Sequence, residues 1–276
     1  MKARFQLANP AARCRAELQR QFALIQGLEK ATATGKVEAL HDLRVALRRL
    51  RVLLRALAGL LEHTGAEEIE RRWQSFADDL SPLRDADVWR GLLRELPGVT
   101  PAFRHRVHTR LRRERGRPAA VLRLPAWSRL KRATKALLAR QLPAALIKAG
   151  EKQITSELQR AWKQASARAA KLARNRQLAK VEPAHKLRIA CRRVRYLAEF
   201  LALAVEGKKN RQAWQLLAGD YRALQNALGR THDADVLLEF LHEARLRPPA
   251  ALVRELRHRR VNGVRQFKKL WRGLGT

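Results

Sequence analysis

An internal repeat constrains the fold of this chain more than any other feature of its sequence. The segment VEALHDLR at 37–44 returns as VEPAHKLR at 181–188, and the agreement in residue type continues downstream of both segments. The aligned pairs that follow are Arg48 and Arg192, Arg49 and Arg193, Arg51 and Arg195, Asp85 and Asp233, and Asp87 and Asp235. Duplication of one structural unit is the simplest source of such a repeat. We therefore predict a single domain, 1–276, with repeat halves at about 1–140 and 143–276.

Helices account for the hydrophobic pattern along the chain. Apolar residues recur at spacings of three and four, whereas the alternation typical of β-strands is nearly absent. Proline and glycine mark the expected helix ends, at Asn9-Pro10, Thr34-Gly35, Thr64-Gly65, Pro97 to Pro101, Gly116 to Pro125, Pro143, Gly207 and Pro248-Pro249. The predicted fold class is therefore all-α, with about ten helices. The stretch from Gly116 to Pro125 is the expected connection between the halves.

The charge balance points to an anionic partner. The chain carries 59 Lys and Arg against 25 Asp and Glu, a formal net charge of +34. Self-repulsion of this size disfavours a compact state unless a concentrated anion offsets it, so nucleic acid, an anionic membrane and polyphosphate are the candidate partners. Because the apolar fraction of 46% is ordinary for a globular protein, we expect an ordered chain.

The cysteines and the hydropathy pattern predict a cytoplasmic protein. Cys14 and Cys191 lie far apart and outside any Cys/His spacing typical of zinc, which predicts neither a disulfide framework nor a zinc site. The first ten residues lack the apolar core of a signal peptide, and no window approaches the ~20 apolar residues of a membrane span. We expect no metal, no cofactor and no membrane insertion.

The first copy of the repeat places basic side chains in a row. On a helical wheel of 100° per residue, the basic residues lie within a quarter turn and the leucines lie on the opposite face. The row contains His41, Arg44, Arg48, Arg51 and Arg55, and the leucine face contains Leu43, Leu47, Leu50, Leu54 and Leu61. At ~1.5 Å per residue the row is ~20 Å long, which suits a linear polyanion.

The second copy repeats this geometry over a shorter distance. Its stripe contains His185, Arg188, Arg192 and Arg195. Glu199 replaces Arg55, Tyr196 lies at the edge of the stripe, and further along His232 stands where the first half has Arg84. Guanidinium groups form bidentate hydrogen bonds with phosphate and keep their charge in a cationic environment. Because Glu199 and His232 replace arginines of the first half, the second half is expected to be less basic near its motif.

A solvated face is the alternative explanation of both rows, because many amphipathic helices expose charged residues in this way. A solvated face constrains polarity alone, whereas the two copies agree in residue type. For the histidines, helix capping and a buried structural role are as well supported as direct contact with an anion.

Two pairs of carboxylates, Asp85 with Asp87 and Asp233 with Asp235, follow the basic rows. We expect new helices to begin there, so N-capping and favourable interaction with the helix dipole explain these residues. The alternative is that they orient arginines, since a carboxylate bonded to one edge of a guanidinium leaves the other edge for phosphate. Metal binding is less favoured, because paired carboxylates alone are an unspecific signal.

Together these motifs resemble the CHAD domain, the conserved-histidine α-helical domain. The resemblance rests on His-x-x-Arg-x-x-x-Arg-Arg-x-Arg at 41–51 and 185–195 and on the two Asp-Ala-Asp-Val blocks, and it covers nearly the whole chain. It implies two four-helix bundles related by pseudo-twofold symmetry, with a basic channel or surface between them that binds inorganic polyphosphate, and association with polyphosphate granules. The implied contacts are His41, Arg44, Arg48, Arg49, Arg51, Arg55, His185, Arg188, Arg192, Arg193 and Arg195.

Nucleic-acid binding is the main competing function, because it relies on the same phosphate electrostatics. The chain has only two Tyr, and its Trp and Phe residues lie mainly at helix-core spacing, so stacking platforms for bases are hard to find. No base-reading motif is recognised. We therefore keep nonspecific binding of RNA or DNA as the alternative.

Enzymatic and membrane functions are less favoured. The sequence has no GxxxxGK[ST] loop, no dense carboxylate cluster and no activated Ser or Cys nucleophile. His105-x-x-His108 has arginine neighbours, so a solvated basic face explains it better than a metal site. Membrane binding ranks last because packing consumes the leucine faces. We predict a protein that binds polyphosphate without catalysing a reaction.

Overall fold

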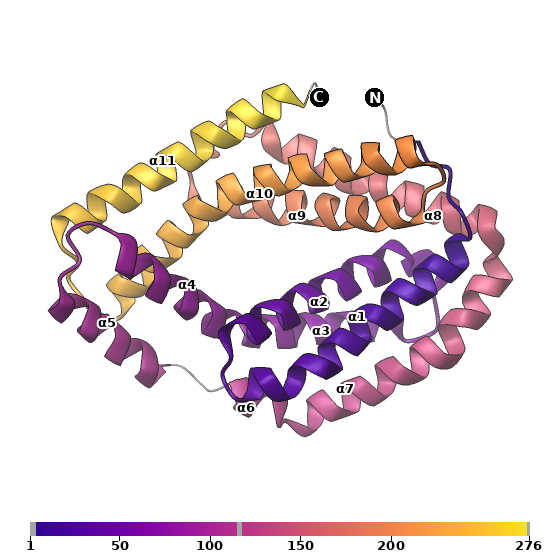
Figure 1. The fold of residues 1–276 in the computed structure, drawn as a ribbon, viewed down its shortest axis with the longest axis horizontal. Coiled ribbons are helices and arrows are strands. Elements are labelled where there is room, and N and C mark those ends of the chain that lie inside the picture. The colour runs from indigo at the N-terminus through magenta and orange to yellow at the C-terminus, as the bar shows by residue number, and fades with distance from the viewer. Residues whose placement is uncertain (1–3, 115–117, 275–276) are drawn as a thin grey trace. The chain divides into compact units, whose positions relative to one another are not determined.

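The computed structural model describes residues 4–114 and 118–274, and these residues form an all-α fold. The helices are α1 Pro10–Ala33, α2 Val37–Ala56, α3 Ala66–Asp79, α4 Ser81–Glu95, α5 Pro101–Glu114, α6 Pro118–Leu122, α7 Pro125–Ala136, α8 Leu142–Ala173, α9 Val181–Ala204, α10 Lys208–Glu243 and α11 Ala250–Gly273 (Figure 1). A 3₁₀ turn, η1, spans Ala58–Leu60, and a π-helical turn, η2, spans Leu137–Gln141. The only β-type pairing among the described residues is an isolated bridge between Leu7 and Val205. The all-α prediction is confirmed.

Several helix ends differ from those that the sequence predicts. Pro143 does not end a helix, because α8 begins at Leu142 directly after η2. A proline ring clashes with the carbonyl four residues earlier in a regular α-helix, and the wider π-helical turn precedes the ring here. The backbone of α8 departs from helical geometry at Gly150 instead, with φ of 69°. Leu61 lies beyond the end of α2, although its side chain is buried.

The predicted connection from Gly116 to Pro125 is described only in part. Residues 116 and 117 lie outside the described ranges, and α6 occupies much of the remainder.

Contacts between Cα atoms divide the chain into two compact units. Unit 1 consists of Met1–Ser81, Arg117–Ala165 and Arg193–Ala218, and unit 2 consists of Pro82–Gly116, Ser166–Arg192 and Gly219–Thr276. Each unit takes segments from both sides of residue 140, so the units do not coincide with the repeat halves. The second motif copy is divided as well, because α9 contributes residues to both units.

The core of unit 1 lies among α1, α2, α3 and α7 (Figure 1). In this core α1 packs on α2, α2 on α3, and α3 on α7. Leu43, Leu47 and Leu50 of α2 are fully buried, as the predicted leucine face requires. Aromatic rings complete this core: Trp73 meets Trp127 edge to face, with ring centroids 5.2 Å apart. Burial of such rings and leucines is the main stabilising contribution to a helical unit of this kind.

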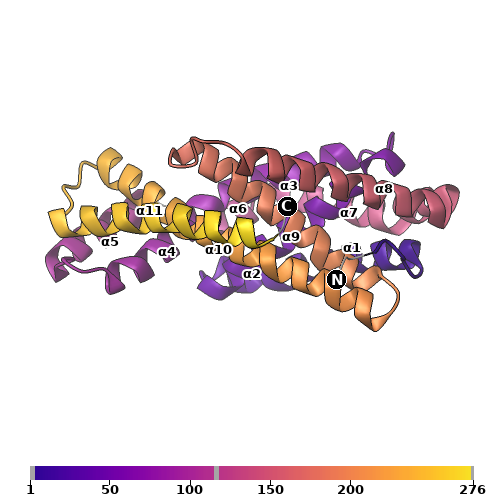
Figure 2. The same ribbon diagram turned by 90° about the horizontal axis from the view of Figure 1, so that it is seen from above.

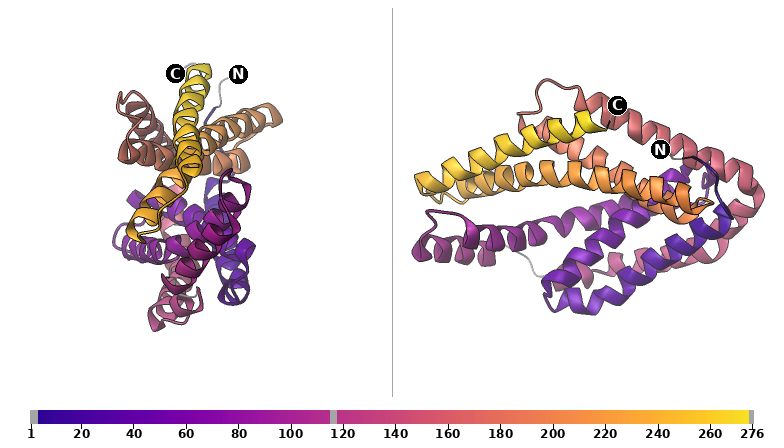
Figure 3. Two further views of the ribbon diagram at one scale, coloured as in Figure 1. Left: turned by 90° about the vertical axis from the view of Figure 1, so that its left-hand side faces the viewer. Right: turned by 45° about the horizontal axis from the view of Figure 1, so that its top comes forward.

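The core of unit 2 is formed by α4, α5, α10 and α11. Its fully buried side chains include Leu93, Val107, Leu111, Leu237, Leu252 and Leu256. Figure 2 and Figure 3 show α11 running back along α10. The two helices approach closely at Gly263, where an added Cβ would lie 2.2 Å from Oγ1 of Thr231 and 2.7 Å from the carbonyl oxygen of Ala227. Glycine at this position therefore permits the close packing of α11 on α10.

Candidate functional site

The first basic row lies on α2 in unit 1, but it is not a simple solvated face. His41 and Arg55 are exposed, whereas the three arginines of the row between them, and the neighbouring Arg49, are half-buried. A freely solvated arginine would extend into water, and these side chains lie against neighbouring helices instead. The contacts of each side chain therefore decide which cations are held in fixed positions.

Three arginines of the row are held against α3, and one of them also contacts the first residue of α4. Arg44 donates through Nη1 to the carbonyl oxygen of Ala77 at 2.8 Å and to Oγ of Ser81 at 2.9 Å. Nε of Arg51 lies 2.7 Å from Oε1 of Glu70, and Nε of Arg55 lies 2.9 Å from the same oxygen.

Glu70 is thus a buried carboxylate shared by two guanidinium groups. Nη2 of Arg51 and Nη2 of Arg55 also donate to Oε1 of Gln74, at 2.8 and 2.9 Å. Burial lowers the pKa of Arg51, and the hydrogen bond to Glu70 opposes that shift. Loss of Glu70 would leave a half-buried arginine without its counter-ion.

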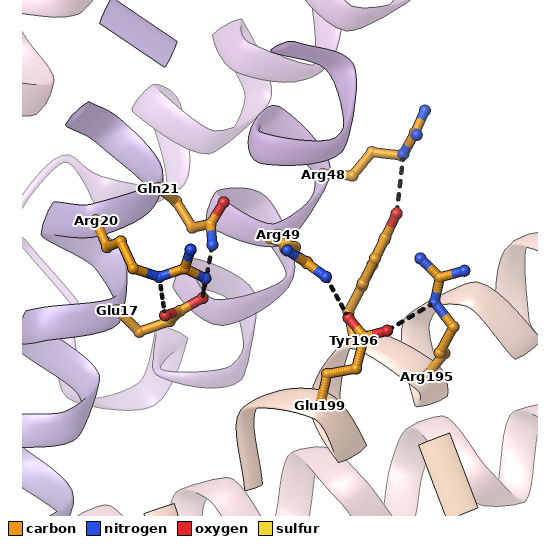
Figure 4. Close-up of polar contacts among 8 residues, drawn as sticks. All are labelled: Glu17, Arg20, Gln21, Arg48, Arg49, Arg195, Tyr196 and Glu199. Carbon is orange, nitrogen blue, oxygen red and sulfur yellow. Dashed lines mark hydrogen bonds and ion pairs between the residues drawn. The ribbon is translucent and has the colours of Figure 1, made fainter. Parts of the chain in front are cut away.

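A second shared carboxylate joins the two motif copies in unit 1, as Figure 4 shows. Glu199 of α9 accepts from Nη2 of Arg49 at 2.7 Å and forms an ion pair with Nε of Arg195 at 3.3 Å. Arg49 belongs to the first copy and Arg195 to the second. The structure therefore brings these two predicted site residues together on one carboxylate.

Tyr196 lies within the same cluster and is almost fully buried, with 4% of its surface exposed. The guanidinium carbon of Arg195 lies 4.5 Å from the ring centroid and that of Arg49 lies 5.6 Å from it, so the ring makes cation–π contacts with both. Nε of Arg48 lies 3.4 Å from the phenol oxygen, a long hydrogen bond (Figure 4). The sequence pattern assigned Tyr196 and Glu199 no role in holding arginines, because their contacts with Arg48 and Arg49 depend on the packing of α9 against α2.

Two histidines from different helices meet in unit 2. Nδ1 of His185 on α9 lies 3.3 Å from Nδ1 of His232 on α10, with ring centroids 4.6 Å apart. Burial lowers the pKa of His232 to about 3, and the charge of Arg188 acts in the same direction. Burial also lowers the pKa of His185, with contributions from Arg188 and Arg192. Both rings are therefore neutral near pH 7, and the arginines carry the positive charge there.

The four aspartates do not cap helices, so that part of the sequence prediction is wrong. Asp85 and Asp87 lie inside α4, which begins at Ser81, and Asp233 and Asp235 lie far inside α10, which begins at Lys208. A capping side chain must stand at the first turn, where backbone N–H groups lack partners.

Contacts with arginines involve the same aspartates. Oδ1 of Asp87 accepts from Nη1 of Arg90 at 2.9 Å, and Oδ1 of Asp235 forms an ion pair with Nε of Arg260 at 3.0 Å. Neither arginine belongs to the predicted motif. Burial raises the pKa of Asp233, and the positive charge of Arg188, a motif residue, lowers it. The orientation of arginines by these carboxylates stays a prediction for Asp233 and Asp85.

The part of the chain that the structure describes contains neither a metal-binding group nor a membrane-spanning helix. Within ranges 4–114 and 118–274, no group of three or more His, Cys, Asp or Glu side chains is placed to hold a metal ion. Over this part of the chain, no helix has the length and apolar character needed to cross a membrane.

Comparison with known proteins gives one family and two similar structures. The model of the CHAD domain family matches residues 16–242. The crystal structure of the CHAD domain from the plant Ricinus communis is similar with a TM-score of 0.69 and 25% identity, over 96% of this chain and 89% of that chain. PptA from Streptomyces chartreusis shares the fold with a TM-score of 0.58 and 17% identity, over 95% of this chain and 99% of that chain. No curated protein matches the sequence significantly.

Proposed function

This chain belongs to the CHAD domain family, and on that premise we propose that it binds inorganic polyphosphate through the arginines of its two motif copies. The observation that carries the proposal is the sharing of carboxylates. Glu70 is shared by Arg51 and Arg55, and Glu199 is shared by Arg49 and Arg195. In each cluster, two guanidinium groups and one carboxylate leave one positive charge. The carboxylate fixes the positions of both guanidinium groups and neutralises only one of their two charges.

Fixed guanidinium groups suit a polymer of phosphates. Each charge-assisted hydrogen bond to phosphate is short and strong, and side chains that are already ordered lose little entropy when they bind. Glu199 and Tyr196 hold Arg49 and Arg195 from several sides, so these arginines are ordered before any ligand arrives. Many modest contacts of this kind would give high affinity for a long chain and weak affinity for a single phosphate.

The register of the two motif copies supports the proposed duplication. α2 begins at Val37 and α9 begins at Val181, so His41 and His185 each occupy the fifth position of their helix. We propose that the halves at about 1–140 and 143–276 arose from one four-helix unit and are related by pseudo-twofold symmetry.

Binding without catalysis is part of the same proposal. The shared carboxylates hold arginines and are not grouped for metal-assisted hydrolysis. Polyphosphate of unchanged length after incubation with the protein and Mg²⁺ would support a binding function, whereas shortened chains or released phosphate would indicate an enzyme. We expect the protein to associate with polyphosphate granules in the cell.

Titration calorimetry with long-chain polyphosphate at near-physiological salt tests the proposal. RNA at equal phosphate concentration serves as the competitor. About eight phosphate contacts would give a log–log salt slope near −6. Binding that RNA does not displace supports polyphosphate as the ligand. Equal competition by RNA would indicate a general polyanion binder instead.

Charge reversal in the motif tests which arginines bind. The double variant R48E/R192E changes one half-buried arginine of each copy and should nearly abolish binding while helicity is retained. The control R13E/R168E makes the same charge change at exposed arginines of α1 and α8. A folded R48E/R192E protein that binds as tightly as the control would remove these positions from the site.

A further inference from the structure

A second group of arginines gathers on α4 and α5 in unit 2, outside both motif copies. Arg90 and Arg94 lie four residues apart on α4, and Arg104, His108 and Arg112 lie four residues apart on α5. Side chains at this spacing share one face of a helix. Each set therefore forms a short basic row, and we call the five residues together the α4/α5 basic face.

The packing of unit 2 brings the two rows together. Trp89 and Leu93, each one position before an arginine of α4, lie in the same buried cluster as Phe103, Val107 and Leu111. The last three residues each precede a member of the α5 row. Because the buried rows pack in one core, the neighbouring basic rows are held beside that core on both helices.

His108 reports how closely the arginines converge. Burial lowers the pKa of its imidazole, and the positive charges of Arg90, Arg94, Arg104 and Arg112 lower it further. Four guanidinium groups from two helices therefore act on one side chain. A phosphate placed among them would interact with several positive charges at once.

The positive charge of the α4/α5 basic face is only partly balanced, and two of its nitrogen atoms lack hydrogen-bond partners among the described residues. Asp87 pairs with Arg90 at 2.9 Å, and that is the only ion pair to the α4/α5 basic face among the described residues. Nε of Arg104 and Nε2 of His108 are buried and have no hydrogen-bond partner within the same residues. Buried polar atoms are usually satisfied, so a small rotation of either side chain toward an anionic oxygen would supply the missing partner.

We propose that the α4/α5 basic face is a second binding site for phosphate groups, used by a segment of polyphosphate. Only the identity of the polymer rests on the proposed function. The affinity of this face for a short phosphate chain is independent of the motif arginines, and that independence makes the two proposals separable.

Nuclear magnetic resonance of the histidine rings provides a local readout, with tripolyphosphate as the probe. His108→Gln identifies the His108 signal. In the wild-type protein and in R48E/R192E, the signal should shift saturably with added tripolyphosphate. In R94Q/R104Q the shift should disappear. The second variant, R94Q/R112Q, changes two exposed arginines and replaces the first if Arg104 proves necessary for folding.

The affinity of long polyphosphate gives the second measurement. R94Q/R104Q loses two phosphate contacts, which should weaken the binding of long polyphosphate about tenfold and reduce the log–log salt slope by about 1.4. R13Q/R168Q, which removes the same charge elsewhere, should do neither. A His108 signal that does not respond to tripolyphosphate in a folded protein would overturn this inference and leave the proposed function intact. A responding signal in a protein whose long-chain binding is unaffected by R48E/R192E would overturn the motif assignment alone.

Discussion

The free energy of unfolding should fall between about pH 7.5 and pH 5, and about 2 kcal/mol of this fall should be due to His232. In the His232→Gln variant the fall should therefore be smaller by about 2 kcal/mol. Burial, assisted by the charge of Arg188, lowers the pKa of His232 from 6.5 to about 3. The unfolded chain therefore binds a proton near pH 6.5 that the folded chain does not bind until about pH 3. The contribution of the neutral ring is fully present above the unfolded pKa and is lost as the pH falls toward the folded pKa.

The magnitude follows from these two pKa values. At about pH 5, protonation lowers the free energy of an unfolded histidine by about 2 kcal/mol, whereas a ring whose pKa is about 3 gains almost nothing. Any folded pKa below ~4.5 gives nearly the same value at this pH. The full shift corresponds to about 5 kcal/mol, which is reached only near pH 3.

Urea unfolding followed by circular dichroism at both pH values measures the effect. His232→Gln loses the ring contact with His185 and should be less stable at neutral pH, but its stability should depend less on pH. His242→Gln is the matched control, because His242 is exposed on the same helix. Equal pH dependence of the wild-type protein and His232→Gln would refute the buried neutral pair. The His185→Gln variant should keep most of the dependence, since burial is the first cause of the shift.

Three further substitutions test the packing around the site. Glu70→Gln should lower the free energy of unfolding by about 3 kcal/mol, because it leaves the half-buried Arg51 and the exposed Arg55 without their shared carboxylate. Glu68→Gln, at an exposed ion pair of the same helix, should cost less than about 1 kcal/mol, and paired urea titrations measure both values. In thermal unfolding, Gly263→Ala should destabilise the protein by about 1–3 kcal/mol, whereas Gly219→Ala, with open space around it, should stabilise the protein by about 0.5–1 kcal/mol. Similar effects of both substitutions would contradict the close approach of α11 to α10. Tyr196→Phe should change stability by less than about 1 kcal/mol and Tyr196→Ala by about 3–5 kcal/mol, and a large loss for Tyr196→Phe would mean that the hydroxyl matters more than the ring.

The buried face of a helix could be predicted from the sequence, whereas the positions of some helix ends could not. The buried Leu43, Leu47 and Leu50 follow from their spacing, because a helix with 3.6 residues per turn places them on one face. The predicted start of a helix before Asp233 is wrong, because α10 continues through that region. Local capping residues favour a helix start but do not compel one, and buried contacts along α10 stabilise the uninterrupted helix.

The sequence alone determined the helical class, the duplicated motif, the family and the excess of positive charge, because periodicity, repetition and composition are properties of the chain itself. Only the tertiary structure decided which acceptor two arginines of the first copy meet: Glu70 for Arg51, and Glu199 for Arg49. The same holds for the contact between His185 and His232. These partners lie on different helices, and no periodicity within one helix specifies the angle and register at which another helix packs against it.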